Sequence, residues 1–132
     1  MWIKPTINPS SWTGSVGIAH DNSSTYKSFA ISNYSGKFTV NSANGSWVNI
    51  TSSDLPINEW HHCVATLNAG IIKMYLDGVL IKTYTMDWKN TTVASDTRVQ
   101  IGIDLPGSNE IFTGYYSDIR IYTTELLEED IL

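Results

Sequence analysis

Four aromatic residues stand beside small polar residues in segments that we expect to be loops or strand edges. Each of them has Ser, Thr, Asn or Asp next to it or within a few positions: Trp12, Tyr26, Trp47 and Trp88. A sugar ring presents an apolar C–H face and a rim of hydroxyls, so its binding needs an aromatic surface beside hydrogen-bonding side chains. These four are therefore the predicted carbohydrate-binding residues. For Trp12, Tyr26 and Trp88, burial as plugs beneath long loops is the alternative.

The run His61-His62-Cys63 could ligate a metal or supply a nucleophile. Successive side chains of a strand point to opposite faces, so His61 and Cys63 share one face and His62 lies on the other. Two ligands on one strand do not complete a tetrahedral zinc site, and His20 is the only other histidine. We interpret the run as framework rather than as a metal or catalytic site. We assign Trp60, Tyr75, Phe112 and Tyr122 to the core or framework as well.

The composition favours a single β-rich domain over residues 1–132. Only 16% of the residues are charged, against roughly 25% in an average globular chain, and Ser, Thr and Asn replace the missing charge. A net charge of −5 without a Lys/Arg cluster argues against nucleic acid and anionic membranes as partners. No apolar run approaches the roughly 18 residues that span a bilayer, so we expect no membrane insertion. This composition is typical of an extracellular or virion-surface domain.

Apolar and polar residues alternate with a period of two, and turn residues interrupt the alternation every eight to twelve positions. This pattern predicts short antiparallel strands in a sandwich or barrel. The predicted strands are Trp2–Lys4, Ser15–His20, Ser28–Asn33, Lys37–Asn41, Trp47–Thr51, Glu59–Leu67, Ile71–Leu76, Val79–Tyr84, Val99–Ile103 and Phe112–Tyr122.

Two hairpins are especially clear in the middle of the chain. Asp77-Gly78 between Ile71–Leu76 and Val79–Tyr84 predicts a two-residue type I′ turn, in which both residues have positive φ. Asn68-Ala69-Gly70 should close the preceding pair of strands.

The predicted helix is Glu125–Leu132. Thr124 can cap it, and Leu127 and Ile131 are four residues apart, so they would pack one face onto the sandwich. A helix this short is marginal alone, so tertiary packing must hold it.

Three segments in order resemble those of laminin-G-like domains of the concanavalin A-like lectin/glucanase type. Trp60-His61-His62-Cys63-Val64-Ala65 is similar to their Trp-x-His-Val-Ala strand, and Met74-Tyr75-Leu76-Asp77-Gly78 to their Leu-Tyr-Val-Asp-Gly hairpin. Ile101-Gly102 followed by the segment 112–122 resembles their closing strand, and Trp2-Ile3-Lys4-Pro5 an early one. The resemblance covers the whole chain. It implies an all-β, two-sheet antiparallel jelly-roll sandwich, here with a short C-terminal helix.

The resemblance also implies that the closing strand pairs near the first one. The family usually has a strand ahead of the segment that begins at Trp2, and here Met1 stands immediately before it. We therefore expect either a minimal version of the fold or a piece of a larger one that lacks an N-terminal strand, with an unpaired edge beside Trp2–Lys4. Such an edge would recruit another chain, a second copy or a further part of the same polypeptide.

Several domains of this type hold a calcium ion at the rim of the sandwich. Calcium takes six to eight oxygen ligands from flexible loops. Two loops here offer such oxygens, and the candidate calcium ligands in them are Asp21, Asp104, Asn109 and Glu110. Ordinary Asx turns at the same residues are the alternative.

No enzymatic activity is predicted. Glycosidases of this architecture carry their paired carboxylates in a Glu-x-Asp-x-x-Glu strand, and this chain has no such motif.

Two functions remain open. The first is a non-catalytic, lectin-like module that binds a glycan or cell-surface polysaccharide, with or without calcium. The second is a structural or display domain of a larger assembly, such as a phage capsid decoration or tail fibre, which contacts protein. Both imply extracellular or surface display, on a bacterium or a virion.

Overall fold

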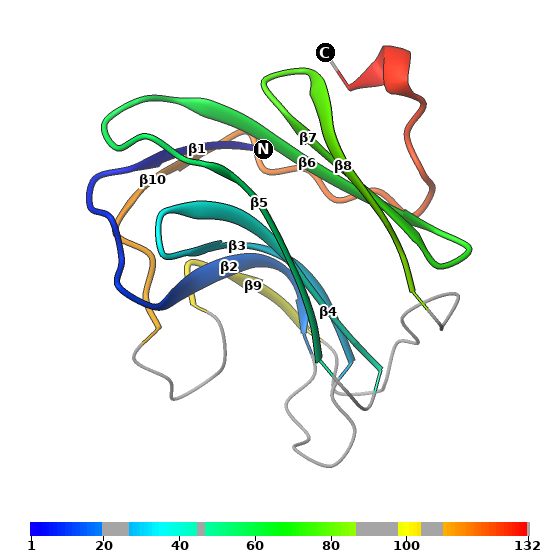
Figure 1. Cartoon of the computed structure of the whole chain (residues 1–132), viewed down its shortest axis with the longest axis horizontal. Helices are drawn as coiled ribbons and strands as arrows, with labels where there is room; N and C mark the ends of the chain where they lie inside the picture. The colour runs from blue at the N-terminus through cyan, green and yellow to red at the C-terminus, as the bar shows by residue number, and fades with distance from the viewer. Residues whose placement is uncertain (20–26, 45–46, 87–97, 104–109, 132) are drawn as a thin grey trace.

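The chain forms a two-sheet antiparallel sandwich, as predicted (Figure 1). The computed structural model describes residues 1–19, 27–44, 47–86, 98–103 and 110–131. The elements in these ranges are β1 (Trp2–Pro5), β2 (Trp12–Ala19), β3 (Lys27–Tyr34), β4 (Lys37–Asn44), β5 (Trp47–Asp54), β6 (His61–Asn68), β7 (Ile71–Leu76), β8 (Val79–Thr85), β9 (Arg98–Ile101), β10 (Gly114–Ser117) and a 3-10 turn, η1 (Glu128–Asp130).

Sheet A has the strand order β10-β1-β6-β7-β8, and sheet B has the order β5-β4-β3-β2-β9. The closing strand pairs with the first one as expected, with Trp2 opposite Ser117. The expected free edge beside Trp2–Lys4 is wrong, because β1 has β10 on one side and β6 on the other. Within the described part of the chain, the edges of sheet A are β10 and β8.

Both predicted hairpins of the middle region are confirmed. Asp77 and Gly78 have φ angles of 51° and 81°, and Leu76 pairs with Val79 across them. Ala69, at φ 48°, forms the equivalent turn with the glycine that follows it, and this turn joins β6 to β7. These turns match the right-handed twist of the strands that they connect.

The core lies between the sheets. It is built from apolar side chains of both sheets, among them Ile3, Val16, Phe38, Val40, Ile50, Cys63, Ile72 and Met74. His61 and Cys63 are 7% and 0% exposed, while His62 on the other face is half-buried, which confirms the predicted alternation. Burial raises the pKa of the Cys63 thiol to about 12, so this cysteine is a packed apolar group rather than a nucleophile.

The assignment of four aromatic residues to the core is half right. Tyr75 and Phe112 are buried, but Trp60 and Tyr122 are 44% and 51% exposed. The closing strand is shorter than the predicted Phe112–Tyr122 and ends at Ser117. Asp118 has a φ of 48°, which ends the strand before Tyr122.

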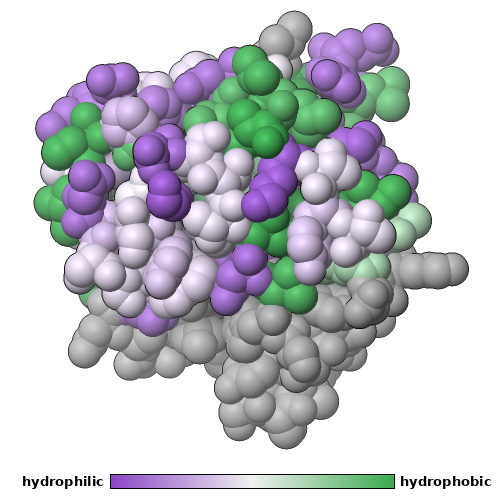
Figure 2. Space-filling view, viewed as in Figure 1, coloured by the Kyte–Doolittle hydropathy of each residue, from purple (hydrophilic) through white to green (hydrophobic). Residues whose placement is uncertain are grey.

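The predicted helix Glu125–Leu132 is wrong, because the described part of this segment contains only the 3-10 turn η1. Leu127 has extended backbone and no side chain caps the turn. Ile131 is 2% exposed and Leu127 is 63% exposed, so the two do not share a buried face. The side chain of Glu125 bonds to strand residues of sheet A instead of starting a helix. In the view of Figure 2, apolar residues gather mainly in the upper part of the molecule, which sheet A and this C-terminal segment form.

Candidate ligand-binding site

The outer side of sheet A exposes large rings near the start of the chain. In β1, Ile3 points into the core and is 1% exposed, whereas Trp2 points outward and is 40% exposed. Trp60, just before β6, and Tyr115 in β10 are 44% and 60% exposed. We call these outward rings, Trp2, Trp60, His62 and Tyr115, the aromatic face.

The aromatic face consists of two pairs of rings. Trp60 and Tyr115 have ring centroids 6.5 Å apart, and Trp2 stacks on His62 with centroids 5.0 Å apart. The register places Tyr115 opposite Lys4, two residues along β1 from Trp2. The two pairs are therefore about 7 Å apart along the strand direction. Together they place two ring pairs in a row along β1 on the outer side of sheet A.

A hollow of about 190 Å³ lies at one end of the aromatic face, between Trp2, His62, Asp77 and Gly78. Its polar group is the Asp77 carboxylate, whose side chain is 49% exposed. The backbone N–H of His62 donates to Oδ1 of Asp77 at 2.7 Å, and Nδ1 of His61 lies 3.1 Å from Oδ2. The β6–β7–β8 hairpins therefore hold this carboxylate in place.

The charges in the hollow follow from these contacts. Burial acts to raise the pKa of Asp77, but the hydrogen bonds from His61 and His62 outweigh it and the pKa is lowered. Burial lowers the pKa of His62, so its ring is neutral at pH 7. At that pH the hollow offers a fixed anionic acceptor beside two rings.

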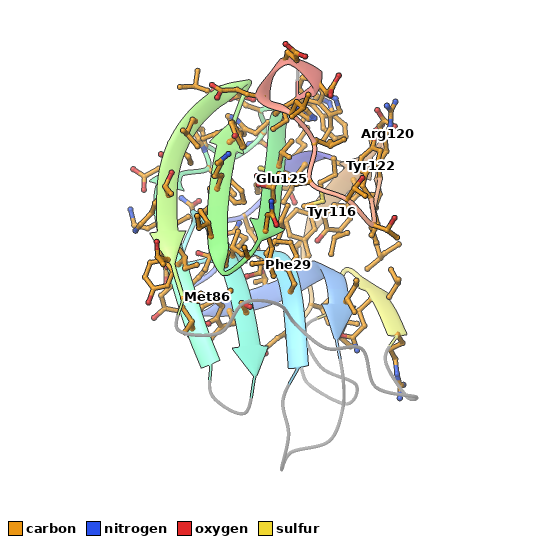
Figure 3. The ribbon with its side chains drawn as sticks, turned by 90° about the vertical axis from the view of Figure 1, so that its right-hand side faces the viewer. Phe29, Met86, Tyr116, Arg120, Tyr122 and Glu125 are labelled. Carbon is orange, nitrogen blue, oxygen red and sulfur yellow. The ribbon has the colours of Figure 1, made fainter. Side chains whose placement is uncertain are left out.

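The other half of the outer face of sheet A is covered by the C-terminal segment. Glu125 accepts a hydrogen bond of 2.8 Å from Asn68 and lies 3.3 Å from the ammonium of Lys73 (Figure 3). Ile131 is 2% exposed, and Tyr75 in β7 is 1% exposed although it points away from the core. The aromatic face is a part of this surface that the segment leaves open.

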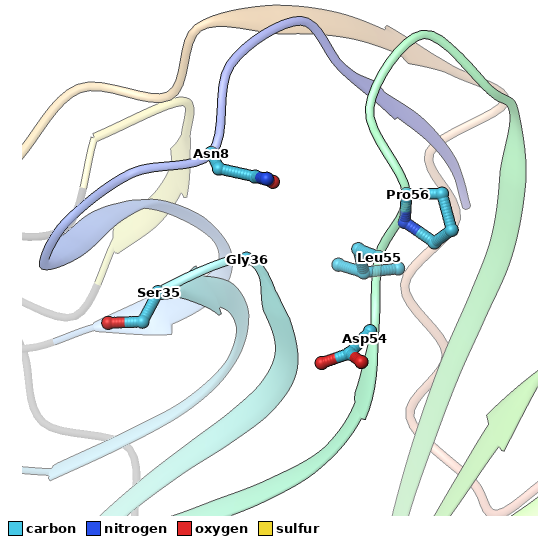
Figure 4. A pocket seen from close by; sticks show the side chains of 6 residues that line it. All are labelled: Asn8, Ser35, Gly36, Asp54, Leu55 and Pro56. Carbon is cyan, nitrogen blue, oxygen red and sulfur yellow. The ribbon is translucent and has the colours of Figure 1, made fainter.

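A second hollow, of about 350 Å³, lies where the segment after β1 meets the β3–β4 turn and the end of β5 (Figure 4). It is lined by Asn8, Ser35, Gly36, Asp54, Leu55 and Pro56. Lys37 pairs with the Asp54 carboxylate. This hollow is polar, and no aromatic ring is among its lining residues.

The outer side of sheet B differs from that of sheet A. Gln100, Gly17, Ala30 and Asn41 follow one another across four neighbouring strands. The three of these residues that have side chains are at most 6% exposed. Oδ1 of Asn41, Oε1 of Gln100 and Oγ of Ser32 are buried without a hydrogen-bond partner.

The predicted carbohydrate-binding residues do not form one described site. Trp12 begins β2 and stacks on Tyr34 with ring centroids 4.1 Å apart, which leaves it half-buried. Trp47 begins β5, and its backbone pairs with Ala43 of β4. Tyr34 pairs with Lys37 of β4, which is six residues away from Ala43. Trp12 and Trp47 therefore stand about 20 Å apart along sheet B. Tyr26 and Trp88 lie outside the described residues.

Three of the four predicted calcium ligands, Asp21, Asp104 and Asn109, also lie outside the described residues. Glu110 is described and is half-buried. The parts of the chain that the structure describes contain no group of three His, Cys, Asp or Glu side chains that could hold a metal ion. The calcium site stays a prediction.

The interpretation of the sequence missed Trp2, Trp60 and Tyr115 as candidate binding residues. One signal was present, because strand alternation places residue 60 on the same outward face as His62. The other signal was not local, since it depends on β1 lying between β6 and β10.

A family model described as the concanavalin A-like lectin/glucanases superfamily matches residues 1–132. The adhesion G-protein coupled receptor V1 of Danio rerio is 26% identical over 139 aligned residues, which include 99% of this chain. The chain spans 2% of the length of that receptor. Among the described residues, no helix is long and apolar enough to cross a membrane.

Proposed function

Because the chain belongs to the concanavalin A-like lectin/glucanase superfamily, we propose that it is a non-catalytic carbohydrate-binding module that serves adhesion at a surface. Membership supports a lectin-like or adhesion-type binding module at the level of the superfamily. Binding of sugar and the position of the site are the proposal.

The exposed aromatic face of sheet A is the observation that supports this proposal. Trp2 and Trp60 are 40% and 44% exposed, although the residues that follow them, Ile3 and His61, are almost fully buried. An exposed ring pair on a sheet offers the apolar C–H face of a sugar a matching surface. The Asp77 carboxylate beside Trp2 offers an acceptor to sugar hydroxyls.

The proposal is a binding site rather than a glycosidase. Hydrolysis needs two carboxyl groups that face one sugar bond, roughly 5–9.5 Å apart. The hollow beside the aromatic face is lined by one carboxylate, Asp77, and its pKa is lowered, which is unsuited to a general acid. The superfamily includes glucanases by name, so assays for glycoside hydrolysis belong in the test.

The proposed location is extracellular or surface-displayed. The relative from Danio rerio is an adhesion receptor by name, and the superfamily match covers all of the chain. Display on a bacterium or virion is the form that we propose, with a cell-surface polysaccharide as the partner.

A glycan array followed by titration calorimetry tests the proposal. Trp60→Ala and Tyr115→Ala should each weaken binding about tenfold or more, because aromatic residues at the centre of a contact supply most of its free energy. Tyr84→Ala is the matched control, since Tyr84 is 38% exposed on β8, on the opposite edge of sheet A. Equal affinities of all three variants and the parent chain would place sugar binding elsewhere.

Calcium dependence is measured in the same titrations. Binding in the presence of calcium and after chelation with EDTA should differ if Asp21, Asp104, Asn109 and Glu110 hold an ion that shapes the site. Identical affinities would remove calcium from the proposal and leave sugar binding in place.

A display domain that contacts protein is the second candidate function. Among the described residues β10 is an edge of sheet A, and Tyr122, which follows this strand, is 51% exposed; both observations favour it. In that case the aromatic face would be buried against a partner chain, and the glycan array would be blank.

A further inference from the structure

The charged groups around the aromatic face balance one another. Lys4 on β1 is opposite Tyr115 of β10. Asp77 lines the hollow at the Trp2 end of the aromatic face. Asp118 and Arg120, beyond the end of β10, pair with each other at 2.7 Å. The N-terminal ammonium acts on His62, and exposed Glu59 directly precedes Trp60. The formal charges of these six groups sum to zero, and the chain as a whole carries −5.

A sulfated or uronic-acid glycan would meet no cationic surplus here. Proteins recognise such polyanions through several Lys or Arg side chains that are free to pair with the ligand. At this face Lys4 is a single half-buried cation, the guanidinium of Arg120 is already paired, and the carboxylate of Asp77 would repel an anionic sugar in the hollow.

We propose that the aromatic face binds an uncharged, extended glycan, with the Asp77 carboxylate accepting hydrogen bonds from sugar hydroxyls in the hollow. This inference rests on the proposed function and adds the class of sugar and its polar anchor. The two ring pairs follow one another along β1, so at least two consecutive sugar units would lie over Trp60–Tyr115 and Trp2–His62.

Asp77 is suited to this task because hydrogen bonds hold its carboxylate in place and still leave lone pairs available to a ligand. Each carboxylate oxygen accepts one contact from β6, the His62 N–H on Oδ1 and the His61 ring on Oδ2. An ionised carboxylate has about four lone-pair positions, so capacity remains for sugar hydroxyls. The side chain is 49% exposed, and the positive φ of the Asp77-Gly78 turn sets its position beside Trp2.

The test uses calorimetry with three neutral probes, cellohexaose, chitohexaose and laminarihexaose, and one anionic probe, a heparin hexasaccharide. At least one neutral probe should bind, with an affinity that changes less than about twofold between 20 and 500 mM NaCl, because no ion pair is screened. Asp77→Asn should weaken that binding about tenfold, as expected for a hydrogen bond to a charged group. An amide at this position can still accept the His62 N–H, so the turn should fold, and thermal melting checks this.

Asp54→Asn is the matched control, because Asp54 is an exposed carboxylate in the other hollow. It should leave the affinity unchanged. Binding of the heparin probe alone, with strong salt dependence, would overturn the uncharged class and leave the proposed function standing. Binding of a neutral probe that Asp77→Asn does not weaken would remove Asp77 as the anchor. No binding of any probe, together with a blank glycan array, would overturn the proposed function itself.

Discussion

The two sheets of this sandwich expose opposite kinds of outer surface. Sheet A carries large rings that stay in water, such as Trp2 and Tyr115, on a surface that a covering segment only half conceals. Sheet B carries small and amide side chains, such as Ala30 and Asn41, and these are buried. A cluster of large apolar groups left in water is typical of an interaction site, so the rings on sheet A favour a role in binding. On sheet B, Gly17 serves close packing, because there is no space for a Cβ at this position.

The largest effect on stability is expected at Gly17 of sheet B, where the backbone leaves no space for a Cβ. A Cβ at Gly17 would lie 2.3 Å from the carbonyl oxygen of Phe29 and 2.5 Å from Cα of Ala30. Both contacts are with backbone, so Gly17→Ala should lower the free energy of unfolding by about 3 kcal/mol. Chemical denaturation measures this. Ser117→Ala, at an exposed position on sheet A, should change the same quantity by less than about 0.5 kcal/mol.

A smaller effect is expected at the segment that divides the outer face of sheet A. Hydrogen bonds from Asn68 and Lys73 lower the pKa of Glu125 below its ordinary value of 4.5. The stabilisation that the ionised Glu125 carboxylate gives to the folded state is therefore complete above pH 4.5, and it is lost as the pH falls through the lowered pKa. Glu125→Gln should lower the melting temperature at pH 7, by less than Gly17→Ala does. The difference from the parent chain should shrink below pH 4.5. A difference that persists in acid would mean that the carboxylate charge is not what holds the segment.

The smallest effect is expected for the buried hydroxyl of Ser32, which has no hydrogen-bond partner. Ser32→Ala removes an unsatisfied group and should leave stability unchanged or raise it, within about 1 kcal/mol. Thr13→Val is the comparison, because the Thr13 hydroxyl donates to the carbonyl oxygen of Asn33 at 3.1 Å. That variant should lose about 1 kcal/mol. A clear loss of stability in Ser32→Ala would show that this hydroxyl has a partner in solution.

Local sequence predicted the strands well because the turns are local. The predicted bounds Ile71–Leu76 match β7 to the residue, since a two-residue turn precedes and follows it. The C-terminal helix failed for the opposite reason. Glu125 contacts Asn68 and Lys73, more than fifty residues away, and no helical pattern contains that information.

The candidate site was less predictable than the fold. The aromatic face requires β1 to lie between β6 and β10, which brings Trp2, Trp60 and Tyr115 together from distant parts of the chain. Alternation within one strand tells which side a ring faces, but not which rings become neighbours. The prediction therefore fell on loop aromatics, of which Tyr26 and Trp88 lie outside the described residues.

The pairing of β1 with β10 also bears on how the protein folds during synthesis. The hairpins of β6, β7 and β8 join neighbours in sequence, so they can form as soon as they leave the ribosome. The strand of Trp2 can be paired on both sides only after Ser117, its partner on β10, has been synthesised. Until then β1 presents an unpaired edge to other nascent chains. A chain without β10 should therefore aggregate more readily than the whole sequence.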